Sequence, residues 1–483
     1  MSPPPDDHDC GWKAFAQDQA RQVAELQAKF AELQRHVFGR KSERRAKPDK
    51  LPPPLPPVPA DPAATTELRA AARVQRREAM PTEVIELHVP DDDRTCPRCP
   101  GATPLAPIGA TQSAIIDFVS AHLRRRVFRS ETLACACGHV ISAPAPARFG
   151  DKGQFGPSLV AHVVVAKIAH AIPQHRLLAS YREQGLDLPR QTACDLLHRA
   201  ATMLSPLYDA ALARVADAYL VHADETSMRQ QDRTGKAYLW SFVTPDLTVY
   251  RYATTRSGDI PAGVLRDSTG ILLVDAYTGY NAVTAPGKRT RAGCWAHVRR
   301  KLHAQRAVPE VAPVLALISA LYAVERDAHD ADLVGGRAHL ALRTTRARPI
   351  MAMIFRWARL HRRRHEPRSA LGRAIAYLLT NRAALTLCTR HPTLPLDNNV
   401  AERSLRRAAM GRASSLFVGH EASGHRHAIL YTLVNSCQQH GLNPVDYLAD
   451  VLARIDDHPA AQIADLLPDR WRPPDDSSTV ATP

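Results

Sequence analysis

Two apolar runs that each lead into a carboxylate constrain the fold of this chain more than any other feature. One run ends at Asp224, and the second, which is apolar throughout, ends at Asp275. A continuous apolar run is typical of a strand buried in the centre of a sheet. A third carboxylate, Glu402, lies among arginines in residues 396–406, which predict a helix. The pattern predicts two strands and a helix that carry these three acids.

The segments around the carboxylates predict a multi-domain α/β protein. Residues 236–243 and 247–252 predict strands joined by short polar turns, as in an antiparallel meander, and a helix follows them. Three strands, a helix and a central strand form the opening order of an RNase H-like fold. We expect this core over residues 215–305 and 391–460, the latter with the acidic helix and a C-terminal helical region. Residues 306–390, rich in Ala, Leu and Arg, predict a helical insertion.

Residues 12–47 predict one helix whose apolar residues recur at alternating three- and four-residue steps. That spacing is typical of a coiled coil, and its seam consists of Val23, Leu26, Phe30, Leu33 and Val37. We expect this leucine-zipper-like helix to pair protomers, although an amphipathic helix docked on its own domain would show the same pattern. Residues 48–66 are rich in proline and predict an extended linker.

Residues 83–147 predict a small β module with a zinc site. Four cysteines form two close pairs, which can hold a tetrahedral Zn²⁺ ion: Cys96, Cys99, Cys135 and Cys137. The second pair is spaced more tightly than the usual Cys-x-x-Cys, so His139 could replace one ligand. Four free thiols in a small β domain are the alternative.

Residues 155–205 predict three helices, with a tight turn at residues 185–189 before the third. A helix, a turn with glycine and a second helix form the outline of a helix-turn-helix, which binds DNA in many proteins. Ordinary helical hairpins share this outline. Residues 467–483, rich in proline and ending in DDSSTVATP, predict a disordered tail.

The charge balance favours a polyanionic partner. The formal net charge is +15 and the pI is about 9.6, so nucleic acid is the first candidate, and a merely basic protein is the alternative. No apolar run approaches the ~20 residues of a membrane span, and the N-terminus lacks the basic start and apolar core of a secretory signal. Apart from the paired ones, the nine cysteines are scattered, which predicts a reducing compartment and a cytoplasmic protein.

Three carboxylates on two strands and a helix form the ligand set of a two-metal phosphoryl-transfer site. Asp224, Asp275 and Glu402 would bind the metal, and their hard oxygens select Mg²⁺ or Mn²⁺ rather than zinc. Taken singly, an Asp at a strand end is often a turn or cap residue, so the prediction depends on the three occurring together. Glu225 adjoins Asp224 and would point to the other face of the strand, which makes it the second choice as a ligand.

Basic residues near these carboxylates predict contacts with DNA. Arg403 and Arg406 flank Glu402 and could hold phosphates, or could pair with Glu402 itself. In the segment GCWAHVRRK, His297 could orient water or contact a phosphate, and Arg300 could bind DNA. The Cys-x-x-His spacing of that segment also suggests a metal half-site, but no second pair is near it. A buried Cys and Trp with a basic solvent face is the alternative.

At these residues the chain resembles transposases of the bacterial insertion sequence 66 family. The motifs that carry the resemblance follow one another along most of the chain: FGRKSER, CPRC, CAC, HADET, DAYTGYN, GCWAHVRRK and LDNNVAERSLR. The resemblance implies a DDE-type, RNase H-like catalytic domain that uses Mg²⁺. It places the catalytic residues at Asp224 of HADET, Asp275 of DAYTGYN and Glu402 of DNNVAER.

The resemblance also implies the partners, which are the terminal inverted repeats of the element, target DNA and small accessory proteins of the same element. Two departures from the family pattern stand out. One is the close Cys135 and Cys137 spacing, and the other is that Arg412, predicted to contact DNA, precedes Ala413 where the family tends to a lysine. We expect a homo-oligomeric transposase at the bacterial nucleoid. A non-catalytic DNA-binding protein with the same fold and an RNase H-like nuclease without strand transfer are the alternatives.

Overall fold

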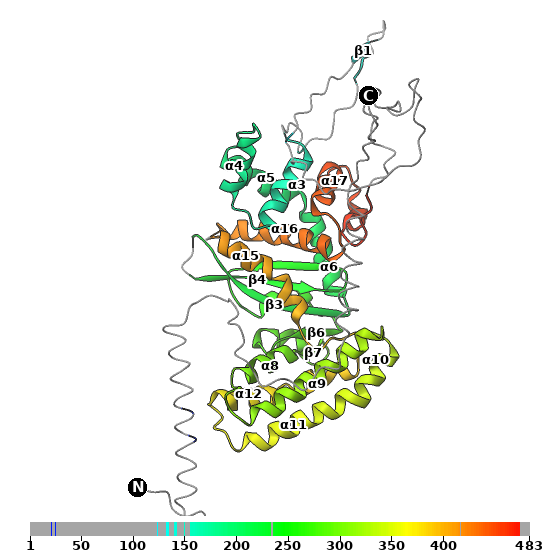
Figure 1. Cartoon of the computed structure of the whole chain (residues 1–483). Coiled ribbons are helices and arrows are strands. Elements are labelled where there is room, and N and C mark those ends of the chain that lie inside the picture. The colour runs from blue at the N-terminus through cyan, green and yellow to red at the C-terminus, as the bar shows by residue number, and fades with distance from the viewer. Residues whose placement is uncertain are drawn as a thin grey trace, which may run out of the picture. The chain divides into compact units, whose positions relative to one another are not determined.

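The computed structural model describes residues 155–473 other than 233, 234 and 416, together with isolated earlier positions. Those positions are 21, 25, 123, 132–134, 140–142 and 149. The chain divides into two units, Met1–Ile116 and Asp117–Pro483, and nearly all described residues belong to the second (Figure 1).

The N-terminal predictions fall mostly outside the described residues. Arg21 and Glu25 are helical. The rest of the predicted coiled coil, the Pro-rich linker and the four cysteines of the predicted zinc site lie outside the described part. Within the predicted zinc module, β1 (Thr132–Ala134) and β2 (Val140–Ser142) form a two-stranded antiparallel sheet.

A five-stranded mixed sheet organises the second unit, in the order β5-β4-β3-β6-β7 (Figure 1). The strands are β3 (Leu220–Arg229), β4 (Lys236–Val243), β5 (Thr248–Ala253), β6 (Ile271–Val274) and β7 (Thr290–Gly293). β3 and β5 are both antiparallel to β4, whereas β6 is parallel to β3 and β7 is parallel to β6. Helix α7 (Asp259–Leu265) precedes β6, an interior strand between β3 and β7, as predicted. The protein is therefore of the mixed α/β class.

Strand β6 contributes to two separate cores. Leu272 and Val274 belong to one hydrophobic cluster, whereas Ile271 and Leu273 belong to the other. Successive residues of a strand point to opposite faces, so helices must cover both faces of the sheet here. This is why the run is apolar throughout instead of alternating with polar residues.

Helices from both ends of the described chain form the core that contains Leu272. They are α3 (Pro157–Ile168), α4 (Gln174–Glu183), α5 (Arg190–Met203), α6 (Ser205–Asp217), α15 (Arg406–Ser414), α16 (Glu421–Gln439) and α17 (Pro444–Arg454). α16 packs along β5, and α3 packs against α17 (Figure 1). The three predicted N-terminal helices are present, and Gly185, at φ 88°, ends the second with a backbone conformation that favours glycine. Their role as a helix-turn-helix stays a prediction.

The core that contains Leu273 is built by the residues between β7 and the acidic helix. Its elements are α8 (Trp295–His303), α9 (Val311–Asp330), α10 (Arg337–Leu342), the π-helical η4 (Arg343–Ala347), α11 (Arg348–Arg362), α12 (Ala370–Thr380), α13 (Arg382–Thr386) and the 3₁₀ turn η5 (Leu387–Thr389). The segment predicted as a helical insertion is therefore helical. Among the described helices, none is both long and apolar enough to cross a membrane.

The structure corrects two predicted boundaries and adds one strand. Asp224 does not end its strand, because β3 continues to pair with β4 as far as Arg229. The predicted disordered tail begins too early, because Leu467 and Trp471 are buried, and Trp471 donates a hydrogen bond to Asp450 at 2.7 Å. Strand β7 was not predicted.

Arg343 ties the helical layer together from the inside. Its side chain is 1% exposed and pairs with Glu325 at 2.6 Å. It also donates to the carbonyl oxygens of Cys388 and Leu394, each at 2.9 Å. One guanidinium therefore joins α9 to the loop that leads to the acidic helix.

We predict that Arg343→Met lowers the free energy of unfolding by about 3–5 kcal/mol, because it leaves Glu325 and buried carbonyls without their partner. The matched control is Arg346→Met. Arg346 pairs with Asp327 at 2.7 Å, but both side chains are 49% exposed, so its loss should cost less than about 1 kcal/mol. Chemical denaturation measures both changes, and equal losses would contradict the structural role of Arg343.

Candidate active site

Strands β3 and β6 place two of the predicted acids side by side. Their parallel pairing runs to the partners His222 and Leu273, and Asp224 and Asp275 each follow two residues later. Side chains at matching positions of neighbouring parallel strands lie on the same face of a sheet. Asp224 is still within β3, where β4 supports it, and Asp275 begins the loop after β6.

The Asp224 carboxyl lies in an environment that disfavours its charge. Burial, above all, and the neighbouring Glu225 carboxylate raise its pKa to about 7. Asp275 and Glu402 act in the same direction, so both carboxylates are close enough to repel it, while one backbone hydrogen bond from the Glu225 amide, at 2.9 Å, opposes the rise. Such a cluster of like charges is the arrangement that a bound cation would neutralise.

Glu225 is held by partners on the other side of the strand. Its side chain is 2% exposed, and its two oxygens accept hydrogen bonds from Arg256, at 2.7 Å, and from the Tyr280 hydroxyl, at 2.7 Å. Arg256 in turn lies 4.0 Å over the ring of Tyr277. Because both oxygens of Glu225 are engaged, this side chain supports the site from behind, and it would have to leave both partners to ligate a metal.

Asn398 sets the position of the acidic helix, α14 (Asn399–Ser404). Its buried side-chain amide donates to the Ala223 carbonyl at 2.7 Å, and its amide oxygen lies 3.1 Å from His222 Nδ1. Its backbone amide donates to the Cys294 sulfur at 3.2 Å. One residue thus joins the start of α14 to β3 next to Asp224 and to the start of α8.

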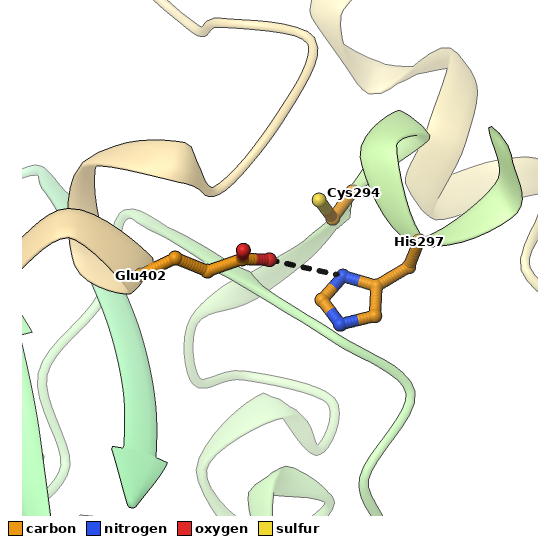
Figure 2. A group of neighbouring side chains, drawn as sticks. All are labelled: Cys294, His297 and Glu402. Carbon is orange, nitrogen blue, oxygen red and sulfur yellow. Dashed lines mark ion pairs between the residues drawn. The ribbon is translucent and has the colours of Figure 1, made fainter. Parts of the chain in front are cut away.

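Glu402 itself turns toward basic residues of α8. Arg300 Nη2 donates to its two oxygens at 3.1 and 3.0 Å, and His297 Nδ1 lies 3.8 Å away (Figure 2). That ring nitrogen is buried and has no hydrogen-bond partner among the described residues. The ligand atoms of Cys294, His297 and Glu402 lie within 4.8 Å of one another, whereas Asp224, Asp275 and Glu402 do not form such a close set in the described part of the chain.

Glu402 therefore joins the Cys294–His297 half-site as a third possible ligand, although it is distant in sequence. Cys294 is fully buried, and burial raises the pKa of its thiol to about 11. A thiol must lose its proton to bind metal, so this cysteine is better suited to packing and to accepting the Asn398 hydrogen bond. The alternative of a buried Cys and Trp beneath a basic face agrees with this geometry, since Trp295 is also fully buried.

The other predicted DNA contacts lie around this site. Arg403 and Arg406 are exposed, but they do not share one helix, because α14 ends at Ser404 and α15 begins at Arg406. The ion pair of Glu402 is made by Arg300 from α8. Arg412 donates to the carbonyl oxygen of Ser227 at 2.6 Å, so it joins α15 to β3. DNA contact by these arginines stays a prediction.

Comparison with known families then identifies the chain. A model described as "Transposase IS66 family" matches residues 152–426, "IS66 C-terminal element" matches 432–468, and "Transposase C of IS166 homeodomain" matches 25–84. The chain belongs to the IS66 transposase family. The first match covers more than half of the chain and contains all three predicted catalytic acids.

Three proteins of Sinorhizobium fredii (strain NBRC 101917 / NGR234) are similar to this IS66 family member over most of their length. The protein named "Uncharacterized protein y4jD" is 31% identical over 495 residues, covering 94% of this chain and 96% of the relative. The protein y4hP is 26% identical over 494 residues, covering 93% and 89%. The protein y4qI is 30% identical over 428 residues, covering 83% and 77%.

Several residues that shape the site in this IS66 family member were not predicted. Asn398 lies within the segment predicted as the acidic helix, but no role was predicted for it, and Arg256 and Tyr280 were not singled out. The pairing of Arg300 with Glu402 spans 102 residues, so no local pattern could show it. A usable signal did exist on α8, because His297 and Arg300 are three residues apart and share one helix face.

The raised pKa of Asp224 predicts a pH-dependent stability in metal-free buffer. Between its ordinary value, 3.8, and about 7, the folded protein binds a proton that the unfolded chain releases, so stability falls as pH rises through this window. Asp224→Asn should therefore be more stable than the wild type at pH 8, on the order of 2–4 kcal/mol, since one pKa unit corresponds to about 1.4 kcal/mol. This advantage should vanish below pH 4.

Denaturation in the presence of a chelator measures this difference at the two pH values. Asp267→Asn serves as the control, because its side chain is 92% exposed and should leave the pH profile unchanged. If the difference between Asp224→Asn and the wild type is the same at pH 8 and pH 4, the buried position of this carboxyl is incorrect.

Proposed function

We propose that this chain is a DNA transposase with an RNase H-like core, in which Asp224, Asp275 and Glu402 hold divalent metal ions. The observation that carries the proposal is the parallel pairing of β3 with β6, which brings Asp224 and Asp275 to the same face of the sheet, together with the packing of α14, which carries Glu402, against β3. The raised pKa of Asp224, to which the carboxylates of two other elements contribute, supports it. Three acids that destabilise one another by repulsion are suited to a cation. Their oxygen donors favour Mg²⁺ or Mn²⁺. The order of the five strands and the helix between β5 and β6 supports the RNase H-like assignment.

Each residue has a distinct part in the proposed chemistry. Asp224 and Asp275 supply ligands from a rigid sheet, and Glu402 supplies a third from α14. Divalent ions at this site would activate a water molecule or a 3′-hydroxyl and stabilise the leaving oxygen. Without a divalent ion, Arg300 neutralises the Glu402 carboxylate. Metal binding would therefore release Arg300, whose exposed guanidinium could then contact a DNA phosphate.

The surroundings of the acids suit a nucleic-acid substrate. Arg299, Arg300 and Lys301 are exposed on α8, and Arg403 and Arg406 are exposed beside Glu402. Cations at the rim can hold phosphates next to the carboxylates, and the formal net charge of +15 would favour long-range attraction to DNA. We propose that the ends of the element and target DNA bind here, in the cytoplasm, with the N-terminal helix pairing protomers and the cysteine pairs holding Zn²⁺.

The second candidate is a DNA-binding protein of the same fold that has lost catalysis. The observation that favours it is the pairing of Glu402 with Arg300 and its separation from a close triad with the two aspartates. A gel shift and a Mg²⁺-dependent nicking assay on one labelled element end distinguish the two. Binding without nicking would support the second candidate, whereas nicking without strand-transfer products would indicate a nuclease.

We predict that Asp224→Ala abolishes strand cleavage while the affinity for the element end stays within about twofold. Loss of a metal ligand removes several kcal/mol of transition-state stabilisation, which corresponds to a rate reduction of about a thousandfold or more. The nicking and gel-shift assays measure both quantities, with Asp267→Ala as an exposed control. Full cleavage by Asp224→Ala would refute the assignment of the site.

We also predict that Arg300→Gln binds Mn²⁺ more tightly than the wild type in the absence of DNA. Arg300 competes with the ion for Glu402, and an ion pair of this exposure is worth up to about 1 kcal/mol, so the gain should be about two- to fivefold. Arg299→Gln removes the same charge from the neighbouring position and should change the affinity less. Isothermal titration measures both, and weaker binding by Arg300→Gln would oppose a role for Glu402 as a ligand.

A further inference from the structure

A second group of metal-ligating side chains lies in the helical layer, on elements that carry none of the three catalytic acids. Glu310 precedes α9, His361 lies in the last turn of α11, and His365 lies in the turn that follows α11. One ligand atom from each residue lies within 4.8 Å of the other two. We propose that Glu310, His361 and His365 form a site for a divalent transition-metal ion of the Zn²⁺ class.

The backbone of Glu310 is fixed next to the two histidines. The Trp357 ring nitrogen donates to the Glu310 carbonyl at 3.0 Å. The ring of Trp357 stacks on His361 with centroids 4.8 Å apart, and His361 stacks on His365 with centroids 6.0 Å apart. The three rings follow one another at four-residue spacing along one side of α11 and its continuation. They hold both imidazoles in nearly parallel planes beside the carboxylate.

The two histidines lack the hydrogen bonds that buried ring nitrogens normally make. His361 Nδ1 and His365 Nε2 are both shielded from solvent, and neither has a hydrogen-bond partner among the described residues. A buried polar atom without a partner costs about 1–3 kcal/mol, so two such atoms on stacked rings require a reason. A metal ion bound by both nitrogens would satisfy them without either ring having to donate a proton.

The charges around the rings are compatible with a cation. Burial lowers the pKa of His361, the Glu310 carboxylate opposes this, and Arg364 and His365 add to it. The neutral imidazole is the form that binds metal. The negative charge of the Glu310 carboxylate would attract the ion and partly offset the positive charge of Arg364.

The donor set selects the kind of ion. Two imidazoles and one carboxylate suit Zn²⁺, and also Ni²⁺ or Cu²⁺, whereas Mg²⁺ prefers oxygen ligands alone. Three protein ligands leave a fourth position for water. The site would therefore differ in metal preference from the three catalytic acids, and its occupation can be tested independently of them.

The bound ion would join the start of α9 to the end of α11. The residues between the two histidines, Arg362, Arg363 and Arg364, are all exposed. Fixing both ends of this short turn would hold three cations in one arrangement on the surface of the helical layer. This consequence follows from the position of the ligands and does not require catalytic activity.

The test compares zinc stoichiometry between full-length variants after chelator treatment and dialysis against Zn²⁺. The wild type should bind one equivalent more than the double variant His361→Ala/His365→Ala, as measured by elemental mass spectrometry. His329→Ala is the matched control, because this histidine lies on α9 with a side chain that is 83% exposed, and it should bind as much zinc as the wild type. Zinc held by the predicted cysteine pairs is common to all variants and cancels in the difference.

Glu310→Gln supplies a second variant that keeps the ring stack. It should weaken zinc binding at this site about tenfold or more, since even outer-shell partners of a metal typically contribute 10–100-fold. Substitution with Co²⁺ separates this site from any cysteine ligands. The difference spectrum between the Co²⁺-loaded wild type and each variant should lack the thiolate-to-cobalt charge-transfer band. Equal zinc stoichiometry in the wild type and in both variants, with unchanged circular dichroism, would overturn the proposal. If the double variant does not fold, the affinity of Glu310→Gln decides the question.

Discussion

The buried hydrogen bonds of Asn398 are the constraint on which the rest of the candidate site depends. They tie the start of α14 to β3 at Ala223 and to the start of α8 at Cys294. An amide side chain at 1% exposure is costly without partners, and this one has two, while the backbone amide of Asn398 has a third, so the register between the helix and the strand is strongly specified. Glu402 lies one helical turn further on, and its amide donates to the Asn398 carbonyl at 3.2 Å, so this anchor also positions the backbone of Glu402.

The two adjacent carboxylates of β3, Glu225 and Asp224, differ in how their negative charge is compensated. On one side of β3, Glu225 is neutralised by Arg256 and hydrogen-bonded by Tyr280, which makes it a fixed part of the scaffold. On the other side, Asp224 has repulsive acids around it and only one backbone donor among its described contacts. Two adjacent acids in one strand thus have opposite environments, because their side chains point to opposite faces. The unsatisfied face is the one suited to bind metal and substrate.

The sequence was sufficient to predict the elements that depend on local pattern. The apolar run before Asp275 correctly predicted a strand buried in the interior of the sheet, because a strand that is covered on both faces is apolar throughout. Strand β7 left no such record, since Thr290–Gly293 is short and contains Arg291, and its pairing with β6 decides its conformation. The continuation of β3 beyond Asp224 is likewise decided by β4. The prolines near Trp471 predicted a disordered tail, but the burial of this one aromatic side chain orders the segment.

The helical layer cannot be an independent appendage to the sheet. Ile271 and Leu273 of β6 belong to its core, and the Trp295 ring nitrogen donates to the Leu385 carbonyl at 2.9 Å. The chain then passes from this layer directly into the segment that Asn398 anchors. The layer therefore helps to position α14, and with it Glu402, against the sheet. A shift of packed helices is transmitted because protein interiors are close-packed and resist small displacements. The position of Glu402 relative to the two aspartates therefore depends on the packing of this layer as well as on the sheet.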